Sequence, residues 1–136
     1  MINTLRQEIL SELQNIDSIS EVFDWIPQKL NSFPSVFFNF DRVESSNLDS
    51  NHNERIYFFQ INILQETKIL WNNNAEKNIC DIIDEIIDTF DRSDLNWNAL
   101  YIDAVGWNID SVETESWPSF HAIIVLWIHT PFTIYQ

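Results

Sequence analysis

Residues 73–90 carry the clearest structural signal in the chain. Apolar side chains recur there at intervals of three and four residues, which places them on one face of a helix. Asn73 with Glu76 fits an N-cap arrangement, and Arg92 follows where the helix dipole favours a cation. Such a helix must bury its apolar stripe, so the rest of the chain has to supply a surface for it. The stripe consists of Ile79, Ile82, Ile83, Ile86, Ile87 and Phe90.

Residues 57–63 predict a strand that would form part of this surface. Aromatic and aliphatic residues alternate there with Gln60 and Asn62, the pattern of a strand with one buried face. Ile56 and Phe58 interrupt the polar side. We therefore expect the outer face near the start of this strand to be covered, either by a helix or by another subunit.

The C-terminal third predicts two more strands. Residues 119–130 are apolar on both alternating faces, which is typical of a central strand. A partner strand is expected over 100–108. The acidic segment 110–115 is expected to connect the two.

The N-terminal part predicts a helix and a short strand. Apolar spacing favours a helix over 4–16, with Thr4 and Gln7 in the positions of a capping box. Residues 21–26 then read as a strand that is stopped by Pro27.

An aromatic-rich strand is expected over 35–43, after a loop at 28–32 and the extended pair Phe33-Pro34. The polar segment 44–53 has no hydrophobic period. It predicts an exposed, mobile hairpin connection of about ten residues.

Together these elements predict a single α+β domain over residues 1–136. The order α-β-β-β-α-β-β implies a mainly antiparallel sheet of four to five strands with two helices packed on one face. A chain of 136 residues with 45% hydrophobic residues can form one core of ordinary size.

The charge balance argues against a nucleic-acid-binding protein. The chain has 21 acidic and 7 basic side chains and a formal charge of -14, whereas binding to a phosphate backbone requires Lys and Arg to replace its counterions. An acidic surface suits solubility, a basic partner, or a wall that DNA passes without adhering.

Scarce glycine and cysteine exclude further classes. Gly106 is the only glycine, and phosphate-binding loops need several residues without a Cβ. The lone Cys80 allows no intramolecular disulfide, and the N-terminus has no signal-peptide pattern, so we expect a cytosolic origin. The apolar run 122–128 is too short to cross a membrane, where about 20 residues are needed.

Candidate catalytic or metal-binding groups are few. The carboxylates of the second helix have spacings that allow convergence on a divalent ion, although a solvated helix face is the favoured interpretation. His121 and His129 lie on one face of a strand but about 26 Å apart, too far to share a metal. His52, in the expected hairpin, lacks an evident orienting partner and nucleophile. We therefore expect no enzyme activity, no cofactor and no metal. The helix carboxylates are Asp81, Asp84, Glu85, Asp88 and Asp91.

The aromatic content is the strongest functional indication. Six Trp and ten Phe residues exceed what one small core readily buries, and aromatic side chains are favoured anchors of protein interfaces; a large aromatic core is the competing explanation. The candidate interface residues are Phe38, Phe40, Arg42, Arg55, Phe58, Trp107 and Trp117. The candidate acidic surface comprises Asp49, Asp110, Glu113 and Glu115.

One motif resembles a known family. Val22-Phe23-Asp24-Trp25-Ile26-Pro27 is followed after a short spacer by Phe33-Pro34-Ser35-Val36-Phe37. This pair of segments is similar to the start of the tail-terminator and tail-completion proteins of long-tailed bacteriophages. The later elements resemble that family in order, although Asn39-Phe40 replaces a small residue or glycine that is often found there.

The resemblance implies a structural virion protein that forms a ring, usually a hexamer, at the head-proximal end of the tail tube. Such a ring ends tube growth and docks to the head connector or neck protein. It implies homo-oligomer and tail-tube contacts, DNA only as repelled cargo, no membrane, and location in the virion tail after assembly in the host cytoplasm. An acidic inhibitor or immunity protein that occupies a basic cleft is the alternative.

Overall fold

The computed structural model describes residues 1–27, 32, 34–47, 52–66, 73–96, 98–99, 101–113 and 118–133. The element order α-β-β-β-α-β-β confirms the predicted α+β fold. The elements are α1 (Ile2–Gln14), β1 (Glu21–Phe23), β2 (Ser35–Asn47), β3 (His52–Glu66), α2 (Asn73–Asp91), β4 (Tyr101–Glu113) and β5 (Pro118–Thr133).

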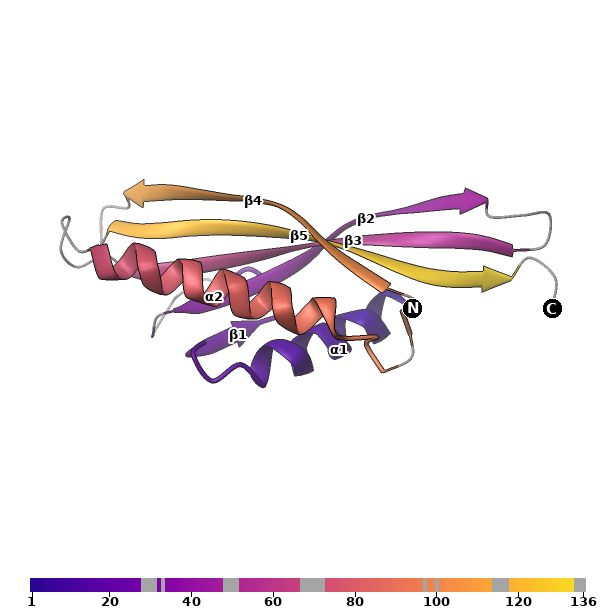
Figure 1. Ribbon diagram of the computed structural model, residues 1–136, viewed down its shortest axis with the longest axis horizontal. Coiled ribbons are helices and arrows are strands. Elements are labelled where there is room, and N and C mark those ends of the chain that lie inside the picture. Colours follow the sequence, from indigo (N-terminus) through magenta and orange to yellow (C-terminus); the bar gives the residue numbers. More distant parts are fainter. Residues whose placement is uncertain are drawn as a thin grey trace.

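The five strands form one sheet in the order β1-β2-β3-β5-β4. Only the β1–β2 pair is parallel, and the other three pairs are antiparallel. β5 lies between β3 and β4, as its apolar faces predict. β3 and β5 have 15 and 16 residues, so each is about 50 Å long. The sheet twists so strongly that its strands cross in projection near the middle (Figure 1).

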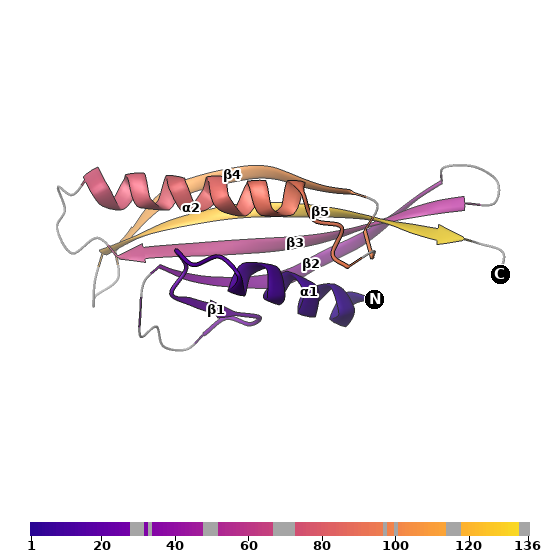
Figure 2. The ribbon, with the colours of Figure 1, turned by 60° about the horizontal axis from the view of Figure 1, so that its bottom comes forward.

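Both helices pack on the same face of the sheet (Figures 1 and 2). The predicted stripe of α2 faces the sheet, with Ile79, Ile86 and Phe90 fully buried. Ile87 is partly buried against the same core. From β3, the alternating residues Tyr57, Phe59, Ile61 and Ile63 point into this core. The apolar face of α2 and the apolar face of β3 thus pack into one hydrophobic layer.

The N-terminal helix contributes Leu5, Ile9 and Leu13, all fully buried. Its predicted capping box is wrong. The helix begins at Ile2 with Met1 in the N-cap position, and no side chain caps it. Thr4 therefore lies inside the first turn, where its hydroxyl is not at the end of the helix.

The predicted connection at 44–53 is also wrong, because both strands continue into it. β2 extends to Asn47 and β3 begins at His52, with Asn47 paired to Asn53. Backbone hydrogen bonds between antiparallel strands do not require an apolar alternation, so this polar segment can extend the ladder. Residues 48–51 lie outside the described part.

Two other strand boundaries differ from the prediction. β4 runs to Glu113 and thus includes most of the acidic segment 110–115 that was expected to be a connection. β1 ends at Phe23, four residues before Pro27, so the proline does not stop it. The expected loop at 28–32 lies almost wholly outside the described residues.

The turn after α2 shows how a chain with one glycine reverses direction. Leu95 and Asn96 adopt positive φ values of 49° and 57°, a region that β-carbon clashes disfavour in most residues. The Leu95 side chain is fully buried, and its backbone N–H donates to Ser93 Oγ at 3.1 Å. Apolar burial and this hydrogen bond offset the conformational cost.

Candidate protein interface on the sheet

The face of the sheet that points away from both helices is the main candidate site, and we call it the open face. Its side chains alternate with those of the helix-covered core along each paired strand. Most are partly exposed, and neither helix contributes to this face. The open face comprises Phe37, Asn39, Arg42, Glu44, Glu54, Ile56, Phe58, Gln60, Asn62, Leu64, Asp103, His121, Ile123, Val125, Trp127 and His129.

One row of the open face runs straight across four strands. Arg42 of β2 pairs with Phe58 of β3, Phe58 with Trp127 of β5, and Trp127 with Asp103 of β4. The Trp127 ring meets the Phe58 ring edge-on at 5.3 Å between centroids, and Arg42 Cζ lies 4.0 Å above Phe58. Phe58 is only 2% exposed. The expected cover by a helix is wrong, because both helices lie on the other face of the sheet (Figure 2). Within the chain, Phe58 is covered by Arg42 and Trp127 of the neighbouring strands.

Arg42 is held in place over Phe58 by two carboxylates. Its Nη1 donates to Asp41 Oδ2 at 2.7 Å and its Nε to Glu44 Oε1 at 3.1 Å. The hydrogen bond to Glu44 raises the pKa of the Arg42 guanidinium above its usual value. The Arg42 side chain is 53% exposed, so it places a fixed positive charge at the outer margin of the sheet.

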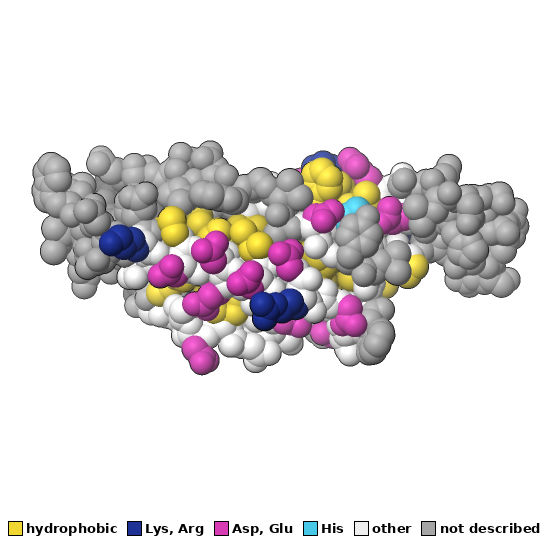
Figure 3. Space-filling model, viewed as in Figure 1, with side chains coloured by type: hydrophobic (Ala, Val, Ile, Leu, Met, Phe, Trp, Pro, Cys, Tyr) yellow, Lys and Arg dark blue, Asp and Glu magenta, His cyan; other side chains and the backbone are white. Residues whose placement is uncertain are grey.

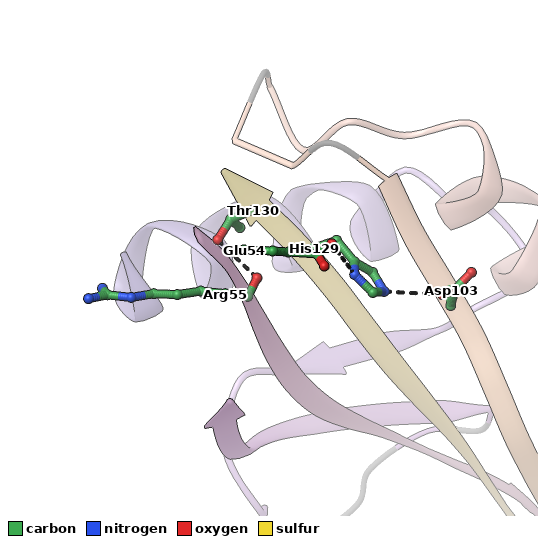
Figure 4. A network of polar contacts seen from close by, with 5 residues as sticks. All are labelled: Glu54, Arg55, Asp103, His129 and Thr130. Atoms are coloured by element: carbon green, nitrogen blue, oxygen red, sulfur yellow. Dashed lines mark hydrogen bonds and ion pairs between the residues drawn. The ribbon is translucent and has the colours of Figure 1, made fainter. Parts of the chain in front are cut away.

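A histidine network crosslinks β3, β5 and β4 (Figure 4). His129 Nδ1 lies 2.5 Å from Glu54 Oε1, and Nε2 lies 3.1 Å from Asp103 Oδ2. Each ring nitrogen of His129 therefore has a carboxylate oxygen within hydrogen-bond distance. His129 and Glu54 are buried, whereas the Asp103 side chain is 47% exposed. With both ring nitrogens engaged, His129 is arranged as a crosslink and not as a free catalytic base.

A second polar network lies farther along the same face. Asn62 Nδ2 donates to Asn39 Oδ1 at 3.3 Å, and His121 Nε2 lies 2.9 Å from Asn62 Oδ1. His121 and His129 thus belong to separate networks. Within the described part of the chain, no group of three or more His, Cys, Asp and Glu residues could hold a metal ion. His52 is the first residue of β3, and its side chain is not described.

The structure separates the predicted interface residues. Phe38 is fully buried in the core, so its assignment to an interface is wrong. Phe40 is partly buried against the same core, with its ring 5.4 Å from that of Phe59. Among the candidate residues whose side chains are described, Arg42 and Phe58 come together in the row described above. Arg55 points away from the His129 network (Figure 4).

The remaining predicted residues lie on β4 or outside the described residues. Trp107 pairs with Ile124, and Asp110 with His121; Glu113 ends the strand. Their side chains are not described. Asp49, Glu115 and Trp117 lie outside the described residues altogether, so the predicted acidic surface can be placed only in part.

The carboxylates of α2 form an exposed surface on the opposite side of the molecule. Acidic side chains gather there over the helix (Figure 3). Ser18 Oγ donates to Glu85 Oε2 at 2.9 Å. The five acids named from the sequence are all exposed, in agreement with a solvated helix face. A pocket beside them is lined by Ser18, Pro34, Gln65, Asn78, Asp81, Ile82 and Glu85.

The sequence did not predict the exposed apolar residues that follow β1. Trp25 is 61% and Ile26 is 69% exposed, and the Trp25 ring lies edge-on to Phe23 at 6.2 Å. An exposed tryptophan is a common anchor of protein interfaces. The expected strand over 21–26 would have placed these side chains in the ladder, which explains why they were missed.

Comparison with known proteins leaves the open face as the main guide to function. No protein-family model matches the chain, and no curated protein matches it significantly. None of the described helices is long and apolar enough to span a membrane.

Proposed function

We propose that this protein is a structural subunit that assembles into a ring, of about six copies, at the head-proximal end of a phage tail tube. There it ends tube growth and docks to the head connector. The observation that carries the proposal is a long sheet with an aromatic open face and unpaired outer edges. Among the described residues, β4 pairs only with β5, and β1 covers only three residues of β2. Unpaired strand edges are sites where further chains add.

The family resemblance supports the same proposal. The two halves of the motif lie side by side, because Val22 of β1 pairs in parallel with Val36 of β2. Trp25 and Ile26, also in the motif, are exposed beside this pair. The motif thus forms one edge of the sheet, where a neighbouring subunit can reach it.

The charge of such a ring suits its location. Six copies at -14 each give a formal charge of -84. DNA that passes through the ring is repelled by acidic side chains that face it. In the proposed virion this charge keeps the exiting genome from adhering to the wall.

The test is assembly of the full chain with and without tail tube, measured by size-exclusion chromatography with light scattering. Six copies of 16.2 kDa form a particle of about 97 kDa, and the same ring is expected at one end of the tube by electron microscopy. The tube in this experiment is assembled from the major tail protein of a long-tailed phage. A strict monomer in both samples, with bare tube ends, contradicts the proposal.

A second candidate function rests on the exposed acids of α2. An inhibitor or immunity protein would place them in a basic cleft. The triple variant Asp84→Asn/Glu85→Gln/Asp88→Asn then abolishes partner binding, whereas the ring proposal expects unchanged assembly on the tube. Loss of tube binding in this variant would favour an interface centred on α2.

A further inference from the structure

Two edges of the sheet are complementary in direction. Along the order β2, β3, β5, β4, each neighbouring pair is antiparallel, so β2 and β4 run in opposite directions. Rotation about a ring axis carries one copy onto the next without reversing its strands. When β4 of one copy meets β2 of the next, the two strands are therefore antiparallel, and the alternation of the sheet continues unbroken.

Among the described residues, these two edges are also unpaired at the same level of the sheet. The portion of β2 beyond its pairing with β1 starts at Phe38. Through the register, residues 38–44 of β2 lie level with residues 101–107 of β4. An intermolecular ladder of about seven residues is within the usual length of strands.

The ends of one open-face row are complementary in charge. Arg42 lies at the β2 end of the row and Asp103 at the β4 end. Arg42 uses Nε and Nη1 for its own carboxylates, and its Nη2 donates to no described residue. Asp103 Oδ2 contacts His129, and its Oδ1 accepts from no described residue. Arg42 Nη2 and Asp103 Oδ1 are thus available to a partner, and each of the two side chains is about half exposed.

Pairing of the β4 edges of two copies is less favourable than pairing of β4 with β2. Two β4 edges would bring acidic strands together, since Asp103, Asp110 and Glu113 all lie on β4, and like charges across a ladder destabilise it. We infer that the partner of the β4 edge is the β2 edge of a second copy of this chain, with Asp103 of one copy beside Arg42 of the next. This contact rests on the proposed ring and specifies its subunit interface.

The first experiment reverses these charges in the full chain. Arg42→Glu and Asp103→Arg are each expected to weaken self-association on the order of tenfold, and the double variant is expected to recover most of the loss. Lys77→Glu on α2 is the matched control and leaves association unchanged. Light scattering over a concentration series, with tail tube if the free chain is monomeric, gives the readout. Equal association of wild type and single variants overturns the inference.

The second experiment uses a disulfide in a Cys80→Ser background. Within one copy, residues 42 and 103 are three strand spacings, about 14 Å, apart, beyond the roughly 7 Å between Cα atoms that a disulfide allows. Arg42→Cys/Asp103→Cys is therefore expected to form only intermolecular disulfides, seen as a ladder of oligomers on non-reducing gels. Each single cysteine variant is the control and gives no species larger than a dimer.

The outcomes separate the interface from the ring. A covalent ladder up to the size measured for wild type supports the β4–β2 contact. Rings without a ladder overturn this contact and leave the proposed function standing. A chain that stays monomeric with and without tube contradicts both.

Discussion

The two faces of the sheet differ in the side chains that they bury. The helix-covered face is hydrocarbon throughout its centre, where Phe38, Phe59 and Ile61 are fully buried. The open face places Phe58 and Trp127 between two polar networks, each anchored by a histidine. The covered face is sealed within one chain, so it needs no polar groups to select a partner. The open face is partly exposed and has aromatic side chains flanked by fixed polar groups, an arrangement that protein interfaces share.

The largest expected effect tests the covered face. Phe59→Ala removes a fully buried ring that packs against Phe38 and Phe40, so the free energy of unfolding is expected to fall by about 4 kcal/mol. Val125→Ala, the open-face control, is expected to cost about 1 kcal/mol because Val125 is only partly buried. Urea denaturation measures both. Equal losses would show that the two faces contribute alike.

The next effect concerns the His129 crosslink. His129→Ala leaves Glu54 buried without its partner, which is expected to cost about 3 kcal/mol of unfolding free energy. His121→Ala is the matched control on the same strand and is expected to cost about 1 kcal/mol. Thermal denaturation at constant pH compares them. A loss no greater for His129 than for His121 means that the crosslink adds little to stability.

The smallest expected effect lies on α2. Neutralising Asp84, Glu85 and Asp88 removes like charges on an exposed helix face, so the free energy of unfolding is expected to change by no more than about 0.5 kcal/mol. Chemical denaturation of the triple variant checks this. A large destabilisation would show that these acids support the fold and are not merely solvated.

The sequence predicted elements that depend on local periodicity. The stripe of α2 and the alternation in β3 each identify a face from residues close in the chain, and the order of elements then implies the α+β architecture. The predictions failed where backbone pairing determines how far a strand extends, as at the polar ends of β2 and β3. Side-chain pattern carries no signal there.

The candidate site was less predictable because its contacts are distant in sequence. Glu54 lies 75 residues from His129, and Asp103 lies 26 residues from it. Glu54 also fell near the end of an expected connection, with no reason to face a histidine. Only the register of three strands brings these groups together, and a shift of one residue would turn each side chain to the other face.

The twist of the sheet limits how neighbouring molecules can contact it. Register shifts interrupt β2 between Phe40 and Arg42, and β4 between Val105 and Trp107, while β3 and β5 pair without interruption. Extra residues in the outer strands increase local coiling, and the strands cross in projection (Figure 1). The two ends of the open face consequently point in different directions, so a flat neighbour can lie along only one end at a time. A partner that covers the whole open face must therefore follow the twist of the sheet.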